Sequence, residues 1–296
     1  MSIKKYSIII PHKDSLDLLA RCVDSIPIRD DIQTIVVDDN SNISNQEWDR
    51  FLKSHSHLEF YPTTEGKGAG YARNIGLRHA TGKWLLFADA DDYFYDKAFQ
   101  VLDDYSDSEF DVIYFVSDSR NGSTLQLIQD RMPIIRQHIE NKNLNGLRFQ
   151  SLVPWGKMIR RSVVEDNHIR FDEVEVSNDV MFSMRLGVAA CSVNAINIPL
   201  YCNTSNSNSL HFHRTVQRMK LRLQVYKRAN DFLYDNGKSE YRIPFSRGAF
   251  YHIKFFYPNH PLLIIWGILH CRYKNDPWGY FKEVCAAIKK HYSAKI

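Results

Sequence analysis

Five apolar residues run directly into a cluster of carboxylates at residues 84–92, which read Trp-Leu-Leu-Phe-Ala-Asp-Ala-Asp-Asp. An unbroken apolar run of this kind is typical of a strand that is buried on both faces, as in a parallel sheet. Carboxylates crowded at the end of such a strand repel one another, and a shared cation relieves the repulsion. Oxygen ligands at this density favour Mg²⁺ or Mn²⁺, with phosphate oxygens completing the shell. The simpler alternative is an acidic loop that caps the next helix.

Apolar runs and helical patterns alternate over the first 117 residues of the chain. Runs at residues 6–10, 34–37 and 111–116 predict further strands, and periodic apolar positions between them predict helices. This alternation indicates an α/β fold with a mostly parallel, Rossmann-like sheet and flanking helices. Ligands bind such sheets at the carboxyl ends of the strands, so we expect the ends near residues 11, 39 and 89 to form a site.

The C-terminal third of the chain is strongly basic. Residues 214–296 contain 16 Lys and Arg but 5 Asp and Glu, a balance of +11, while the whole chain carries +4. An anionic partner is expected for this region, and a bound cation is expected for the acidic remainder of the chain.

The 5 scattered cysteines contain no Cys-x-x-Cys pair, which argues against a disulfide framework or a zinc site and fits a cytoplasmic protein. No signal peptide and no membrane-spanning segment is expected.

Six short motifs occur in the order and at the spacing that are typical of one family. They are Ser7-Ile8-Ile9-Ile10-Pro11, Val36-Val37-Asp38-Asp39-Asn40-Ser41, Ala72-Arg73-Asn74-Ile75-Gly76, Phe87-Ala88-Asp89-Ala90-Asp91-Asp92, Trp155-Gly156-Lys157 and Asn178-Asp179-Val180-Met181-Phe182. The chain resembles the inverting family-two glycosyltransferases of GT-A fold, of the bacterial surface-polysaccharide type, over about residues 5–213. The resemblance implies a nucleotide-sugar-binding half at 1–117 and an acceptor-binding half at 118–213. Beyond it, the composition indicates a separate basic, aromatic-rich helical region at 214–296.

That resemblance implies transfer of a sugar from a nucleotide diphosphate sugar, in the first place a UDP-sugar, to a hydroxyl of a glycan or lipid-linked acceptor. On the donor side, Pro11 would lie beneath the base, Asp39 would accept a hydrogen bond from it, and Arg73 would lie near the diphosphate. Asp91 would ligate Mn²⁺ or Mg²⁺, and Asp89 would contact the ribose or the metal through water. An Asx-turn for Asp39 and a solvated helix face for Arg73 are the simpler alternatives.

On the acceptor side, the resemblance assigns the general base to Asp179, which would take the proton of the attacking hydroxyl. The family's usual Glu-Asp pair is Asn178-Asp179 here, and Glu173 and Glu175 are nearby acids that could be mistaken for the base. The simpler interpretation of Asp179 is the N-cap of a helix that begins at residue 180.

Two aromatic side chains and one glycine pattern leave alternatives open. Trp155 suits either an acceptor-stacking surface or core packing. His211 is a weaker candidate as a metal ligand than as a structural residue. The spacing of Gly66, Gly68 and Gly70 superficially resembles a dinucleotide fingerprint, which would indicate a Rossmann oxidoreductase, but it departs from Gly-x-Gly-x-x-Gly.

The basic third of the chain interleaves aromatic and cationic residues, which are the ingredients of a segment that lies on an anionic membrane surface. An ordinary helical subdomain is an equal alternative. A non-catalytic module that binds anions or membranes is a further function class, but it leaves the six motifs without a role. No nucleic-acid motif is recognisable. We therefore expect a cytoplasmic enzyme. Peripheral attachment to the inner face of the plasma membrane is one of the two alternatives for its C-terminal region.

Overall fold

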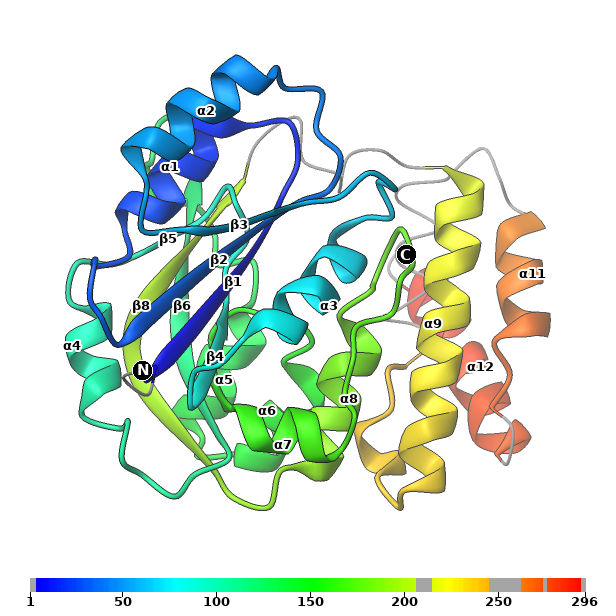
Figure 1. The fold of residues 1–296 in the computed structure, drawn as a ribbon. Helices are drawn as coiled ribbons and strands as arrows, with labels where there is room; N and C mark the ends of the chain where they lie inside the picture. Colours follow the sequence, from blue (N-terminus) through cyan, green and yellow to red (C-terminus); the bar gives the residue numbers. More distant parts are fainter. Residues whose placement is uncertain (1–3, 206–214, 245–261, 274–275, 294–296) are drawn as a thin grey trace. The chain divides into compact units, whose positions relative to one another are not determined.

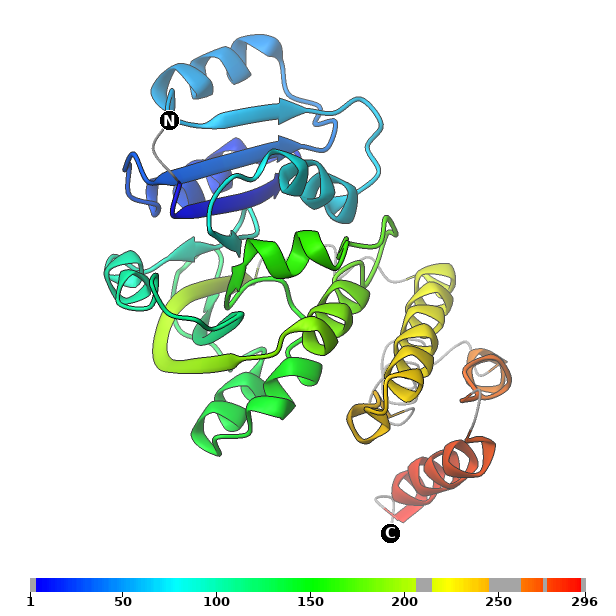
Figure 2. The ribbon, with the colours of Figure 1, turned by 60° about the horizontal axis from the view of Figure 1, so that its bottom comes forward.

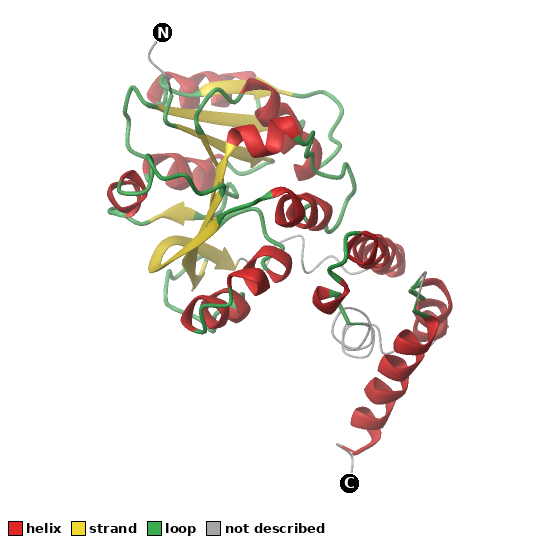
Figure 3. Ribbon diagram, turned by 90° about the horizontal axis from the view of Figure 1, so that it is seen from below, coloured by secondary structure: helices red, strands yellow, loops and turns green. Residues whose placement is uncertain are grey.

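The structure is a computed structural model, and it describes residues 4–205, 215–244, 262–273 and 276–293. Its internal contacts divide the chain into two compact units, Met1–Ser207 and Asn208–Ile296. The first unit contains the described strands and the helices around them, and the second contains helices (Figures 1 and 3). Among the described residues, no helix has the length and apolar character needed to span a membrane.

The first unit is built on an 8-stranded mixed sheet with the strand order β3-β2-β1-β4-β7-β6-β8-β5 (Figure 1). The strands are β1 (Tyr6–His12), β2 (Ile32–Asp38), β3 (Glu59–Pro62), β4 (Trp84–Phe87), β5 (Tyr93–Phe94), β6 (Val112–Asn121), β7 (Lys157–Arg160) and β8 (Val193–Ser205). Strand β1 pairs in parallel with β2 and β4, and β2 pairs in parallel with β3. Strand β7 runs antiparallel between β4 and β6, so the sheet is parallel on the β3 side and mixed beyond β4.

Helices cover this sheet and contribute to its core. They are α1 (Leu16–Asp24), α2 (Asn45–Ser54), α3 (Ala69–His79), α4 (Ala98–Asp103), α5 (Pro133–Glu140), α6 (Leu144–Gln150), α7 (Arg161–Asp166) and α8 (Val180–Ala189). Helix α2 begins with a capping box, in which Ser44 and Glu47 satisfy each other's backbone N–H groups. Helix α3 lies against β1 and β2 (Figure 2). A side chain at Gly76 would collide with Ile9, so glycine permits this close approach.

The apolar runs of the sequence become the centre of the core, because every residue of β1, β2 and β4 is buried. Strand β1 continues through Pro11 to His12, two residues beyond the predicted run. Proline lacks a backbone donor, and it is tolerated here because the pairing of β1 with β4 ends at Ile9. The edge strand β3 was not predicted, since its half-exposed residues form no apolar run.

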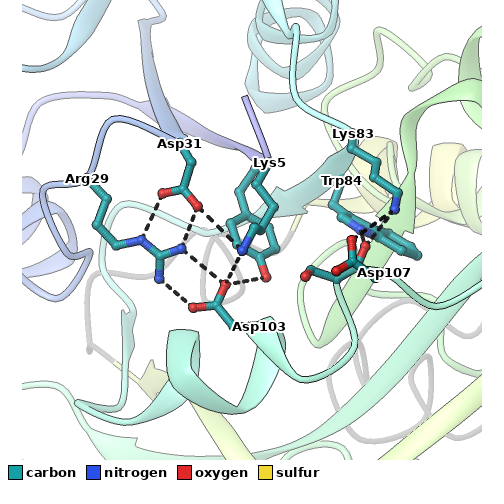
Figure 4. A network of polar contacts seen from close by, with 9 residues as sticks. Lys5, Arg29, Asp31, Lys83, Trp84, Asp103 and Asp107 are labelled. Carbon is teal, nitrogen blue, oxygen red and sulfur yellow. Dashed lines mark hydrogen bonds and ion pairs between the residues drawn. The ribbon is translucent and has the colours of Figure 1, made fainter. Parts of the chain in front are cut away.

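A polar network ties together the amino-terminal side of the sheet, at the opposite end of β1 from the candidate site (Figure 4). Asp103, at the end of α4, accepts hydrogen bonds from Tyr6 Oη at 3.0 Å, Lys5 Nζ at 3.2 Å and Arg29 Nη1 at 2.7 Å. Arg29 also pairs with Asp31 at 2.6 Å. Burial tends to raise the pKa of Asp103, but these cationic and hydroxyl donors outweigh it and lower the pKa.

The second unit contains α9 (Val216–Asp235), the short 3-10 helix η2 (Ser239–Tyr241), α11 (Leu262–His270) and α12 (Pro277–Ser293). Its described helices share a small core to which each of the three α-helices contributes: Met219, Leu223, Leu263, Cys271, Tyr273, Tyr280 and Val284. The expected C-terminal helical region is thus present in the described residues (Figure 3).

Candidate functional site

Three parallel strands bring the predicted donor-side residues to one edge of the sheet. His12 at the end of β1 is in register with Asp38 at the end of β2, and Ile9 is in register with Phe87 at the end of β4. Pro11, Asp39 and Asp89 therefore lie at neighbouring strand ends, as the alternation pattern predicts.

Asp38 is buried and takes part in a local network. Because His12 Nε2 accepts the Ser15 N–H at 3.1 Å, His12 Nδ1 carries the proton and donates to Asp38 Oδ1 at 2.8 Å. Ser41 donates its backbone N–H to Asp38 Oδ2 at 2.9 Å. Burial opposes ionisation of Asp38, but the His12 and Ser41 hydrogen bonds lower its pKa overall. The carboxylate of Asp38 therefore shapes the strand end and is not available to a ligand.

Asp39 is also buried, with 4% of its surface exposed, but only one of its oxygens is satisfied. Oδ2 accepts the Gly68 N–H at 2.9 Å, whereas Oδ1 is buried and has no hydrogen-bond partner among the described residues. Burial raises the pKa of this carboxyl. Gly68 has a φ of 92°, so the glycine-rich loop is shaped to point an amide at Asp39. An orphaned acceptor of this kind is costly without a donor, which makes Oδ1 a candidate ligand contact.

Arg73 joins the donor-side and acceptor-side motifs. Its guanidinium donates to Asp89 Oδ1 at 2.6 Å and to Asn178 Oδ1 at 3.0 Å, and it lies over the Phe171 ring at 5.3 Å from the centroid. Only 5% of Arg73 is exposed, so the solvated helix face is excluded. The buried cation of Arg73 thus connects Asn178, which precedes Asp179, to Asp89, the first carboxylate of the acidic loop at residues 88–92.

The acidic loop after β4 is attached to β8. Asp92 is 2% exposed and accepts hydrogen bonds from Tyr201 Oη and from the Thr204 N–H, both at 2.7 Å. Burial first, then the charges of Asp91 and Asp89, raise the pKa of Asp92 well above its ordinary value. The charges of Asp89 and Asp91 thus act on Asp92, whose side chain points into the protein.

The donor set of this loop fits a divalent cation that is shared with a phosphate. Among the described residues, no group of three or more His, Cys, Asp or Glu side chains could hold a metal on its own. Asp89 and Asp91 remain as a carboxylate pair, and Mg²⁺-type sites are commonly completed by substrate phosphates and water. His211, the third predicted ligand, lies outside the described residues.

Asp179 immediately precedes α8, but its side chain makes no capping hydrogen bond. The N-cap interpretation therefore does not account for this carboxylate. Burial is the largest influence on Asp179 and raises its pKa. The positive charge of Arg73 lowers this pKa, the negative charge of Asp89 raises it, and the positive charge of Lys157 lowers it by a smaller amount. A half-buried carboxyl with an elevated pKa beside fixed cations is the usual setting of a general base.

The loop before Asp179 is fastened to α3. Asn74 donates to the Phe171 carbonyl at 3.0 Å and accepts the Phe171 N–H at 2.8 Å. A side chain at Gly70 would collide with the main chain of this loop, so glycine is required at the first turn of α3. The two competing acids of the loop are Glu173 and Glu175, and both are exposed.

Trp155 is 6% exposed and stacks on Tyr201, with 5.6 Å between ring centroids. The ring therefore packs in the core, as the simpler alternative expects, and presents no open face to an acceptor sugar. Nearby, Lys157 is fully buried; its Nζ donates to the carbonyls of Ser151, at 2.9 Å, and of Val153. Burial lowers the pKa of Lys157 to about 7, and the charge of Asp179 opposes that change.

Several residues of this site have no recognisable signal in the sequence. Tyr201 and Thr204 lie on β8, more than 100 residues from the acidic loop that they contact, and Arg21 lies on α1. Tyr201 only follows a short apolar stretch, and Lys157 stands out in the sequence only as the last residue of the Trp155-Gly156-Lys157 motif.

Comparisons with known proteins identify the family of the chain. The family model described as "Glycosyl transferase family 2" matches residues 7–167. Glycosyltransferase GlyA of Streptococcus pneumoniae is 24% identical over 222 residues, which cover 70% of this chain but 31% of GlyA. The putative glycosyltransferase EpsH of Bacillus subtilis is 28% identical over 244 residues, which cover 75% of this chain and 67% of EpsH. The chain thus spans under a third of GlyA and about two thirds of EpsH.

Solved structures share the fold at low sequence identity. S. aureus TarS 1–349 in complex with UDP-GlcNAc has a TM-score of 0.63 at 18% identity, covering 89% of this chain and 79% of that one. The mannosyltransferase PcManGT of Pyrobaculum calidifontis, in complex with GDP-Man and Mn²⁺, has a TM-score of 0.55 at 16% identity, covering 99% and 88%. The predicted GT-A fold is confirmed by these likenesses and by the mixed sheet.

Proposed function

The chain belongs to glycosyl transferase family 2, and from that premise we propose that it moves a sugar from a nucleotide diphosphate sugar to a hydroxyl of a glycan or lipid-linked acceptor, with inversion at the anomeric carbon. The observation that carries the proposal is the orphaned, buried oxygen of Asp39 at the same edge of the sheet as the Asp89–Asp91 pair. A relative that supports it is the Staphylococcus aureus enzyme named poly(ribitol-phosphate) beta-N-acetylglucosaminyltransferase TarS, which is 24% identical over 216 residues.

The hydrogen bonding of Asp39 favours a base with a single N–H at its recognition edge. Oδ2 already accepts the Gly68 N–H, whereas Oδ1 has no hydrogen-bond partner among the described residues. Uracil offers one such donor, its N3–H, which matches the single oxygen that lacks a partner. We therefore favour UDP-sugars over GDP-sugars, with Pro11 of the neighbouring strand β1 in the floor beneath the base.

The diphosphate is proposed to lie at Asp89 and Asp91, which would hold Mn²⁺ or Mg²⁺. When bound, the cation would supply Lewis-acid stabilisation to the leaving diphosphate. Asp91 is the proposed ligand, while Asp89 is oriented by its 2.6 Å ion pair with Arg73 and is left to contact the ribose or a metal-bound water. Arg73 is itself nearly buried, so its charge is fixed in place at this site.

Asp179 is proposed to act as the general base. In the reaction, the acceptor oxygen forms a bond to the anomeric carbon while the bond from that carbon to the diphosphate breaks. The hydroxyl proton passes to the carboxylate of Asp179. The raised pKa of Asp179 suits this role, because it makes the carboxylate a stronger base than an exposed aspartate.

A donor panel tests the proposal directly. Thermal shift with UDP-, GDP- and dTDP-sugars in Mn²⁺ should show stabilisation by UDP-sugars, and release of UDP should follow slowly and stop on addition of EDTA. Activity that survives thorough chelation would refute the metal. Saturable NAD binding without UDP binding would refute the transferase proposal and favour a Rossmann oxidoreductase.

The second unit is proposed to lie on an anionic membrane surface at the cytoplasmic face. Leu262, Ile265 and Leu269 are 74%, 53% and 68% exposed and share one face of α11, while Trp278 and Phe281 on α12 are 72% and 57% exposed. The charge balance of +11 over residues 214–296 adds attraction to acidic lipids.

Liposome sedimentation separates this proposal from an ordinary subdomain. Binding should rise with anionic lipid content and fall with salt. Leu269→Asp should weaken it, whereas Ile28→Asp, at a residue of the first unit that is 75% exposed, is the matched control. Absence of binding at low salt would refute the membrane role and leave the transferase proposal intact.

A further inference from the structure

We propose that Tyr201 and Thr204 at the end of β8, together with Arg21 on α1, are positioning residues for the Asp89–Asp91 carboxylate pair. They contact the backbone from which both carboxylates project, and they are not proposed to touch the donor. This inference rests on the proposed donor site.

The hydrogen bonds from β8 reach three residues of the acidic loop. The hydroxyl of Tyr201 accepts the Asp89 N–H at 2.9 Å and donates to Asp92 Oδ2 at 2.7 Å. Thr204 donates its N–H to Asp92 Oδ1 at 2.7 Å and its hydroxyl to the Asp91 carbonyl at 2.6 Å. The backbone is thus fixed at both members of the carboxylate pair, on either side of Ala90.

Arg21 adds a contact from a different part of the chain. Its Nη2 donates to the same Asp91 carbonyl, and its Nη1 donates to the Gly122 carbonyl at 3.3 Å. The guanidinium lies 5.5 Å from the centre of the Tyr93 ring. The carbonyl of Asp91 therefore receives donors from α1 and from β8, and a change in the direction of this peptide group would break both.

These bonds are protected from water, so solvent cannot replace them. Tyr201, Asp92 and Thr204 are 0%, 2% and 3% exposed. Trp155 stacks on the Tyr201 ring and holds the hydroxyl in place, which gives the buried tryptophan a role at the site without contact to a sugar. Groups that orient metal ligands from behind commonly change metal affinity by about 10–100-fold when they are removed.

Tyr201→Phe is the principal test, because it keeps the ring and its stacking but removes both hydroxyl contacts. We expect the Mn²⁺ concentration needed for half-maximal UDP binding, measured by calorimetry, to rise about 10–100-fold. Metal-free UDP binding, which depends on Asp39, should not change. Thr204→Val removes the hydroxyl donor to Asp91 while it retains the N–H bond to Asp92, and a smaller shift in the same direction is expected.

Tyr6→Phe is the matched control. Tyr6 is also a fully buried tyrosine that donates to a carboxylate, Asp103, at 3.0 Å, but it lies at the opposite end of the sheet. It should lower the melting temperature without changing the Mn²⁺ requirement. If Tyr201→Phe does not fold, Thr204→Val carries the test.

The inference would be overturned if Tyr201→Phe and Thr204→Val both needed the same Mn²⁺ concentration for half-maximal UDP binding as the wild type. The proposed donor site would then still stand. The same weakening of metal-dependent binding in Tyr6→Phe would also overturn it, because general destabilisation would then explain the effect. If the wild-type protein binds UDP without any dependence on metal, the proposed metal at the donor site fails, and this inference fails with it.

Discussion

Replacing Asp179 with Asn separates the proposed chemistry from the fold, because the two side chains have the same shape. The Asp179 side chain makes no capping bond to α8, so the roughly 1 kcal/mol that a lost cap usually costs does not apply. Loss of a general base lowers turnover by about 10²–10⁴-fold. That range corresponds to about 3–5 kcal/mol of activation free energy. Binding of the UDP-sugar should stay close to wild type, since Asp39, Asp89 and Asp91 are unchanged.

The same variant should be as stable as the wild type or more stable. Burial raises the pKa of Asp179 in the folded protein, so folding disfavours its ionised form. Above the pKa of the unfolded chain, about 3.9, this carboxylate therefore costs folding free energy, and neutral Asn removes the cost. Each kcal/mol gained would raise the Tm by about 2–4 °C.

Single-turnover kinetics and a pH profile test this reasoning. In the wild type, the acid limb of kcat/KM should lie above the ordinary aspartate range, and the limb should be absent from the residual activity of Asp179→Asn. Glu173→Gln and Glu175→Gln are matched controls from the same loop, and both should retain turnover. Full turnover in Asp179→Asn would refute the assignment and transfer it to one of these glutamates. A large fall in Tm would instead show a structural role.

Three further variants probe separate parts of the molecule. Asp39→Asn should weaken UDP binding about 10–100-fold in calorimetry, since a hydrogen bond to a charged group contributes about 1.5–3 kcal/mol; an unchanged Kd would contradict base recognition. In the wild type, Lys157 binds a proton more weakly in the folded chain, where its pKa is about 7, than in the unfolded one, so its contribution to stability rises from pH 7 to 9. In urea unfolding, the free energy of unfolding of Lys157→Met should not show this rise with pH. An equal rise in the variant and the wild type would refute the lowered pKa of Lys157 as its cause. Asp103→Asn should lose about 1–2 kcal/mol at pH 7; because the folded pKa of Asp103 is lowered, the difference should narrow as the pH falls below about 4, and a constant difference would argue against an ionic origin.

The parallel part of the sheet was predictable because its strands are buried on both faces. Such strands give unbroken apolar runs, as in residues 6–10 and 84–88, and their ends are marked by polar residues. The edge strand β3 and the two-residue β5 leave no comparable pattern. The antiparallel β7 is four residues long, and only its pairing with β4 and β6 defines it as part of the sheet.

The candidate site was predictable only where its residues form local motifs. Asp39, Asp89 and Asp91 follow strands directly, so their positions could be inferred from sequence. The roles of Arg73 and Trp155 could not be inferred in this way, because they depend on burial. An arginine on a helix face and a tryptophan after a polar stretch have the same sequence pattern whether they are buried or exposed. In this structure, Arg73 is 5% exposed and Trp155 is 6% exposed.

The attachment of the acidic loop to β8 also constrains the order in which the protein can form. The bond between Asp89 and Tyr201 closes a loop of 112 residues, and β5, just after the acidic loop, pairs with β8 as well. Long-range contacts of this kind form late in folding, because the chain entropy of closing the loop must be overcome first. A nascent chain that ended at residue 117 would have synthesised β1, β2 and β4 without the strand that orders their acidic ends. Metal-dependent binding of the donor is therefore expected only after residue 205 has left the ribosome, although every proposed donor ligand has been made more than 100 residues earlier.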